Sequence, residues 1–154
     1  MIKKYYNWIL ENKTYLSDIK DSEVIAATII GEAGGEGKEG MHAVKNVLDN
    51  RAKNKGTSPA GEALRPNQFS MWDSATKGVR VRSDYNKELI KDVIDQYRDH
   101  EHWRTALNIA NNVNLNDITK NANMYYAHNK IKPPYWTKQW TKTVVIGNHT
   151  FGII

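Results

Sequence analysis

The sequence of 154 residues contains no cysteine. Disulfide bonds, a thiolate nucleophile and a cysteine-ligated zinc site are therefore excluded. The chain also lacks an apolar run long enough to cross a membrane, so no membrane insertion is expected. Residues 1–11 begin like a secretory signal peptide, but Asn7 and Glu11 interrupt the apolar stretch and no small-residue cleavage site follows. The length and composition predict a single globular domain over residues 1–154, made in the cytosol without an export signal.

Acidic residues are absent from the last quarter of the chain. Residues 118–154 contain five lysines and no aspartate or glutamate, whereas the rest of the chain carries 17 basic and 17 acidic residues. The net charge of +5 therefore belongs to this segment, which also holds Tyr125, Tyr126, Tyr135, Trp136, Trp140 and Phe151. Cations beside flat aromatic rings suit an anionic polymer, either a nucleic acid or an anionic glycan. A lysine-rich surface over a small aromatic core is the alternative.

The apolar pattern predicts a mainly α domain with a small β element near the C-terminus, an α+β arrangement. A helix is expected in the N-terminal extension of residues 1–21, and the main body in residues 22–154. Further helices are expected after a cap at Asp21 or Ser22, from Gly37 or Lys38, after a cap at Ser83, and around residues 103–110. Residues 68–72 are expected to be extended. A strand is predicted at residues 124–127, and a hairpin at residues 143–151 turns at Gly147-Asn148.

The segment of residues 29–40, IIGEAGGEGKEG, is the most unusual in the chain. An apolar helix runs into Glu32, where burial and the negative end of the helix dipole favour the protonated carboxyl that a general acid requires. The adjacent glycines let a polymer approach the backbone closely. Glu36 and Glu39 fall at the start of the next helix, which favours their ionised forms. The alternative is an exposed glutamate followed by an ordinary turn.

Several short motifs follow one another in a characteristic order. They are GEAGGEG at residues 31–37, Asn50-Arg51, QFSMW at residues 68–72, YYAHN at residues 125–129, and IGNHTF at residues 146–151. Over roughly residues 22–154 this order resembles the SleB-type cell wall hydrolase family, which includes spore-cortex-lytic enzymes and phage-encoded wall hydrolases. Two positions depart from the family pattern: Gly34 replaces the usual arginine, and Ala122-Asn123 replaces the usual Gly-Ala.

The resemblance implies a lysozyme-like fold similar to that of lytic transglycosylases. It also implies peptidoglycan glycan strands as the partner, cut between N-acetylmuramic acid and N-acetylglucosamine, with Glu32 as the single essential acid. No cofactor is implied. The chain would reach the cell wall by another route than secretion, for example with a phage.

Further residues are candidates for binding the substrate: Glu36, Gln68, Phe69, Ser70, Trp72, Tyr125, Tyr126 and His149. Aromatic rings stack on sugars and polar groups bond their hydroxyls, although core packing is equally compatible with Phe69 and Trp72. Strand alternation points only one of the paired tyrosines inward toward Glu32, and Tyr126 is favoured.

Other polar residues are interpreted as structural. Asn50 and Arg51 are expected to hold the turn after the second helix. His128 and His149 are interpreted as hydrogen-bonded scaffold, and the sequence contains no His-Glu-x-x-His motif, so no metal site is predicted.

These features favour a lytic transglycosylase that forms 1,6-anhydromuramyl ends, because this reaction needs only one carboxylate. Ordinary hydrolysis normally uses two, and Glu36 and Asp73 are the candidates for the second. A non-catalytic wall-binding or virion structural module stays open. Nucleic acid is not expected as a partner, because the glutamate-rich loop at residues 31–40 is unfavourable beside phosphates.

Overall fold

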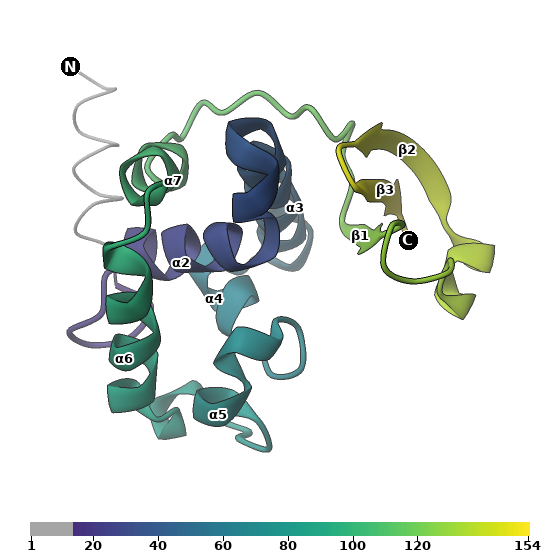
Figure 1. Ribbon diagram of the computed structural model, residues 1–154. Coiled ribbons are helices and arrows are strands. Elements are labelled where there is room, and N and C mark those ends of the chain that lie inside the picture. Colours follow the sequence, from purple (N-terminus) through teal and green to yellow (C-terminus); the bar gives the residue numbers. More distant parts are fainter. Residues whose placement is uncertain (1–13) are drawn as a thin grey trace.

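Helices form the larger part of the structure, and a small antiparallel sheet stands to one side of them (Figure 1). The computed structural model describes residues 14–154. This architecture confirms the predicted mainly helical domain with a small β element. The α-helices are α2 (Asp21–Ala33), α3 (Gly37–Lys55), α4 (Pro59–Leu64), α5 (Asp73–Thr76), α6 (Lys87–Arg98) and α7 (Trp103–Ala110). Short 3-10 helices are η1 (Gly34–Glu36), η2 (Ser70–Trp72), η3 (Arg82–Asp84) and η4 (Tyr135–Gln139).

The expected N-terminal helix falls mostly outside the described residues. Within residues 14–20, Leu16 and Ile19 instead form an isolated antiparallel bridge, and both side chains are buried in the core. Among residues 14–154, no helix combines the length and the apolar character needed to span a membrane.

Helix α2 is the central helix of the body and contacts α3, α4, α6 and α7 (Figure 1). Every residue from Val24 to Ile30 is buried, as expected for a helix that is apolar on all sides. The helix continues through Gly31 and Glu32 to Ala33. A Cβ at Gly31 would lie 2.8 Å from the sulfur of Met71 in η2, so this glycine permits η2 to pack closely on the helix.

The helix starts agree partly with the prediction. Helix α3 begins at Gly37 as expected, and it ends at Gly56, whose φ of +67° gives a left-handed C-cap. The predicted cap at Ser83 is wrong, because that residue lies in η3. Helix α6 is capped instead by Asn86, whose side chain accepts a hydrogen bond from the Leu89 amide at 3.1 Å.

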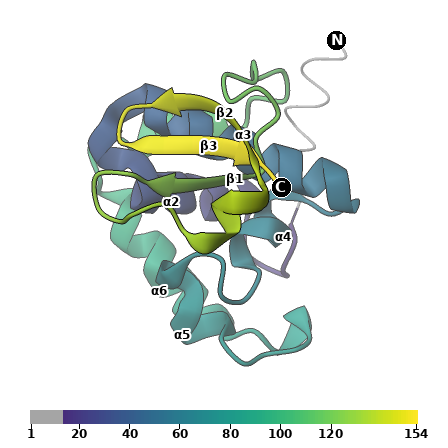
Figure 2. The ribbon, with the colours of Figure 1, turned by 90° about the vertical axis from the view of Figure 1, so that its right-hand side faces the viewer.

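Three antiparallel strands form the sheet in the order β1-β3-β2 (Figure 2). Strand β1 (Met124–Ala127) is an edge strand, and β2 (Thr141–Ile146) and β3 (His149–Ile153) make the predicted hairpin. The inner face packs on α3, with a cluster of Ala43, Val47, Ala122, Ile146 and Phe151. This packing fixes which face of the sheet meets the helical body.

The outer face of the sheet carries an aromatic cluster. Tyr126 of β1 contacts Trp136 and Trp140, with ring centroids 6.4 and 5.9 Å from its own. The Trp140 ring lies so close over Gly152 that a Cβ there would come within 2.3 Å of it. The cluster therefore anchors the connection between β1 and β2 to the sheet.

Candidate active site

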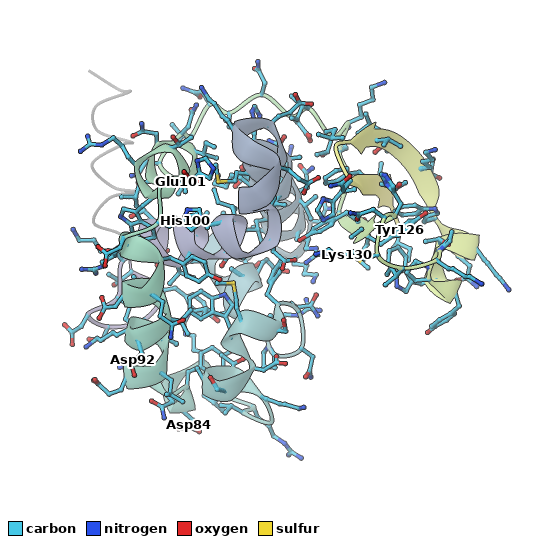
Figure 3. All side chains as sticks on the ribbon, in the orientation of Figure 1. Asp84, Asp92, His100, Glu101, Tyr126 and Lys130 are labelled. Atoms are coloured by element: carbon cyan, nitrogen blue, oxygen red, sulfur yellow. The ribbon has the colours of Figure 1, made fainter. Side chains whose placement is uncertain are left out.

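Glu32 lies in the last turn of α2 at a cavity of about 260 Å³ between the helical body and the sheet. Residues 30–36 line one side of the cavity, and Ala127, Asn129, Lys130, Asn148 and His149 line the other. Lys130, labelled in Figure 3, lies on the sheet side. The Glu32 side chain is partly exposed, so its carboxyl group is accessible from this cavity.

Tyr125 holds the Glu32 carboxyl. Its hydroxyl donates a hydrogen bond of 2.6 Å to Oε1 of Glu32, and this is the only hydrogen bond to that carboxyl within residues 14–154. Burial, and then the neighbouring Glu32 charge, raise the pKa of Tyr125 well above its usual range. The phenol therefore stays a hydrogen-bond donor, and no described residue donates a hydrogen bond to the second oxygen of Glu32.

The tyrosine that meets Glu32 is not the one that the sequence favoured. Tyr125 pairs with Phe151 of β3 and shares the inner face with it, whereas Tyr126 pairs with Thr150. Tyr126 therefore belongs to the outer aromatic cluster. Figure 3 labels Tyr126 on the sheet. Alternation predicted one inward tyrosine correctly, but the packing of the sheet on α3 selected Tyr125.

Glu36 contacts the turn of the hairpin. Its Oε1 accepts a hydrogen bond of 2.6 Å from the Asn148 amide, and its Oε2 lies 2.7 Å from Nδ1 of His149. Both side chains are largely buried, with 13% and 10% exposed for Glu36 and His149. Gly147, with φ of +55°, permits this contact, because a Cβ there would lie 2.5 Å from Oε1 of Glu36.

The two glutamates are connected through two aromatic side chains. The rings of Tyr125 and His149 meet edge to face, with centroids 5.2 Å apart and an interplanar angle of 78°. Tyr125 also packs against Phe151 at a centroid distance of 5.4 Å. We call the chain of contacts Glu32–Tyr125–His149–Glu36 the carboxylate network.

The motif at residues 68–72 does not line this cavity. Phe69 and Trp72 are buried in the core with 4% and 1% exposure, so their faces are not free to stack on a sugar. Trp72 instead donates a hydrogen bond of 3.0 Å from Nε1 to Thr28 of α2. Gln68 and Ser70 are exposed outside the cavity. Phe69 and Trp72 therefore pack in the core and support α2, in agreement with the alternative of core packing.

Asp73, the other candidate for a second carboxylate, also lies outside the cavity. It begins α5, and its Oδ1 is buried without a hydrogen-bond partner among the described residues.

Asn50 and Arg51 anchor the segment that leads into β1, and not the turn after α3 as expected. Asn50 donates to the carbonyl of Ala122 at 2.9 Å, and Nε of Arg51 donates to the carbonyl of Asn123 at 2.6 Å. Because Tyr125 follows Asn123 by two positions, these bonds to α3 help to place the tyrosine opposite Glu32. Sequence reasoning missed this role because the partners are backbone groups about 72 residues away.

Two cavity residues, Asn129 and Lys130, were not predicted from the sequence as site residues. Their position directly after the strand with the paired tyrosines was the available signal. His128 contacts Thr150 with Nδ1 at 3.0 Å from the hydroxyl, and His149 contacts Glu36, so each histidine has a scaffold partner. Within residues 14–154, no group of three His, Asp or Glu side chains is arranged to hold a metal ion.

Comparison with known proteins identifies one family. The profile of the family described as Cell Wall Hydrolase matches residues 35–152, which include Glu36, Tyr125 and the hairpin except for its last residue, Ile153. The match begins three positions after Glu32. No curated protein and no solved structure matches the chain.

Proposed function

Because the chain belongs to the cell wall hydrolase family and acts on peptidoglycan at the cell wall, we propose that it is a lytic transglycosylase with Glu32 as its acid and base. The bond cleaved is the one between N-acetylmuramic acid and N-acetylglucosamine. The observation that carries the proposal is the hydrogen bond from Tyr125 to Oε1 of Glu32, which lines a cavity. This bond fixes the carboxyl and leaves its other oxygen to face a glycan.

The chemistry follows from one carboxyl group used twice. The Glu32 carboxyl donates its proton to the glycosidic oxygen, and the bond from that oxygen to C1 of the muramyl sugar breaks. The resulting carboxylate takes the proton from the C6 hydroxyl, whose oxygen closes onto C1 as the 1,6-anhydro ring. The hydroxyl is already held beside C1, so no second molecule has to be oriented. The Tyr125 hydroxyl stabilises the carboxylate form between the two steps.

The fold supports this assignment at a coarser level. A carboxylate at the end of a buried central helix, facing a small antiparallel sheet, is compatible with the lysozyme-like architecture that the family resemblance implies. Hydrolysis by two carboxylates is the competing chemistry. Its candidate partner in the cavity is Glu36, but each of the Glu36 oxygens contacts a protein nitrogen at 2.6 or 2.7 Å.

Digestion of purified peptidoglycan followed by mass spectrometry of the fragments tests the proposal. We expect 1,6-anhydromuramyl ends, each lighter by one water than a hydrolytic product, and no new reducing sugar. Reducing ends that accumulate with the loss of turbidity would reject transglycosylation but keep the substrate.

A pair of glutamine variants tests the acid itself. Glu32→Gln keeps the shape of the side chain but removes the transferable proton, so we expect activity to fall by at least about 10²-fold. Glu39→Gln is the matched control, because Glu39 is an exposed residue in the first turn of α3. A folded Glu32→Gln protein with near-normal clearing would refute the role of Glu32. If the wild-type chain bound the wall but released no soluble fragments, the non-catalytic binding module would replace the enzyme.

A further inference from the structure

Glu36 joins the helical body to the hairpin beside the cavity of the candidate active site. It closes η1 at the point where the chain passes from α2 to α3. Its Oε1 accepts from the Asn148 amide in the turn, and its Oε2 meets Nδ1 of His149 at the start of β3. Gly147 completes the fit, because any side chain there would collide with Oε1. Three consecutive residues of the hairpin are therefore fitted to one carboxylate.

The contact with Glu36 determines the orientation of the His149 ring. A carboxylate only accepts hydrogen bonds, so the hydrogen between the two groups is carried by Nδ1 of His149. A fixed partner on one ring nitrogen sets the ring plane and its tautomer. With only 10% of its side chain exposed, His149 has little room to rotate away.

The His149 ring in turn forms one wall of the Tyr125 site. The Tyr125 and His149 rings meet at 78°, and Phe151 also packs against the tyrosine, with its ring tilted by 35°. This packing directs the Tyr125 hydroxyl at Oε1 of Glu32. We propose that Glu36 is a positioning residue, which acts through His149 and Tyr125 to orient the Glu32 carboxyl.

This inference rests on the proposed function of Glu32 and assigns a different task to the second acid of the motif. A catalytic second carboxylate has to activate a water molecule or attack C1 with a free oxygen. Both oxygens of Glu36 are engaged by protein donors, and only 13% of its side chain is exposed. Two engaged oxygens suit a carboxylate that holds the Asn148 amide and the His149 ring in place.

Steady-state kinetics on a soluble peptidoglycan oligosaccharide provide the first test. We expect Glu36→Ala to lower kcat by about 10- to 100-fold, the range typical of groups that orient a reactive side chain, with KM changed much less. Glu36→Gln retains an oxygen for the Asn148 amide and an NH₂ group for Nδ1 of His149, so it should recover most of the loss. Glu39→Gln is again the matched control. A Glu36→Gln protein as inactive as Glu32→Gln would overturn the positioning role and make Glu36 a catalytic carboxylate.

The pH profile of kcat separates orientation from proton exchange by Glu36 itself. If Tyr125 loosens in Glu36→Ala, its hydroxyl no longer fixes the Glu32 carboxyl, so we expect kcat to fall by a similar factor across the whole profile. An unmoved basic limb together with a lost acidic limb would mean that Glu36 itself exchanges the proton, against the proposal. These results differ from failure of the proposed function, in which Glu32→Gln stays active.

A double-mutant cycle tests the path through His149. Glu36→Ala and His149→Ala each remove the same link, so we expect the double variant to be no more than about threefold slower than the slower single variant. Independent, multiplying losses would contradict the path. For any variant that folds poorly, the ¹⁵N resonance of the His149 ring provides a second measurement. In the wild type the resonance should be that of a protonated Nδ1, and it should change in Glu36→Gln. An unprotonated Nδ1 in the wild type would refute the geometry.

Discussion

Tyr125 and Glu32 lie 93 positions apart in the chain, yet the tyrosine hydroxyl donates a 2.6 Å hydrogen bond to the glutamate carboxyl. One residue comes from the end of the central helix and the other from an edge strand of the sheet. The candidate active site therefore exists only when the sheet is seated on α3.

Removal of the Tyr125 hydroxyl should affect activity more than stability. In Tyr125→Phe the aromatic packing stays, and water replaces the lost donor at the partly exposed Glu32. We expect the free energy of unfolding to fall by about 0.5–1.5 kcal/mol, and kcat to fall by about tenfold or more. Urea unfolding and the kinetics described above measure both. A variant with normal kcat would show that the hydrogen bond does not orient the acid.

The stability of the wild type should fall at alkaline pH. Burial and the Glu32 charge raise the pKa of Tyr125 in the folded chain, whereas an exposed tyrosine titrates near about 10. Above that pH the unfolded chain loses this proton and the folded chain keeps it. The contribution of Tyr125 to the free energy of unfolding is therefore present below about pH 10 and is lost as the pH rises. Urea unfolding at pH 8 and pH 10.5 should show a smaller loss of the free energy of unfolding between the two pH values in Tyr125→Phe than in the wild type. Equal losses in both proteins would contradict the buried, protonated phenol.

Gly147→Ala should disrupt the contact between Glu36 and the hairpin. The new Cβ meets Oε1 of Glu36 at 2.5 Å and also strains the backbone at φ of +55°. Gly78→Ala is the matched control, because Gly78 has φ of +76° and open space around it. We expect the backbone strain to lower the free energy of unfolding by roughly 1 kcal/mol in each variant. In Gly147→Ala the collision with Glu36 should lower it further and should also lower activity. Identical thermal midpoints and activities for the two would show that Glu36 tolerates displacement.

A larger residue at Gly35 should block the cavity without unfolding the protein. Gly35 lines the cavity, is exposed, and has nothing within 4 Å of an added Cβ. We expect Gly35→Leu to keep the wild-type thermal midpoint but to raise KM, while Gly35→Ala changes little. If Gly35→Leu bound and cut the oligosaccharide normally, the substrate would have to run elsewhere.

Attachment to the wall should depend on the lysines of the acid-free segment. Peptidoglycan carries carboxylates on its peptides, and exposed charges are screened as salt increases. We expect binding of the Glu32→Gln protein to purified sacculi to weaken between tens and hundreds of millimolar salt. Removal of the exposed Lys130, Lys132 and Lys138 charges should mimic this effect, and the same change at Lys20, Lys53 and Lys77 should not. Salt-independent binding would refute an electrostatic role.

The sequence alone predicted the features that depend on neighbours along the chain. The helix start at Gly37 and the hairpin around Gly147-Asn148 follow from local backbone preferences, and both are confirmed. The apolar run before Glu32 placed this acid at the end of a buried helix. The order of the short motifs was enough to identify the family, because such motifs survive as residue types at fixed spacing.

The tertiary structure decided what each of these residues contacts. A period of two says that Tyr125 and Tyr126 point in opposite directions, but only the packing of Phe151 and Ile146 on α3 determines which one faces Glu32. The same holds for Trp72, a ring that fits a sugar groove or a core equally well until α2 covers it. Glu36 meets the hairpin across 112 positions. Contacts at such separations depend on how whole elements pack, and no local pattern in the chain encodes the direction from which the partner arrives.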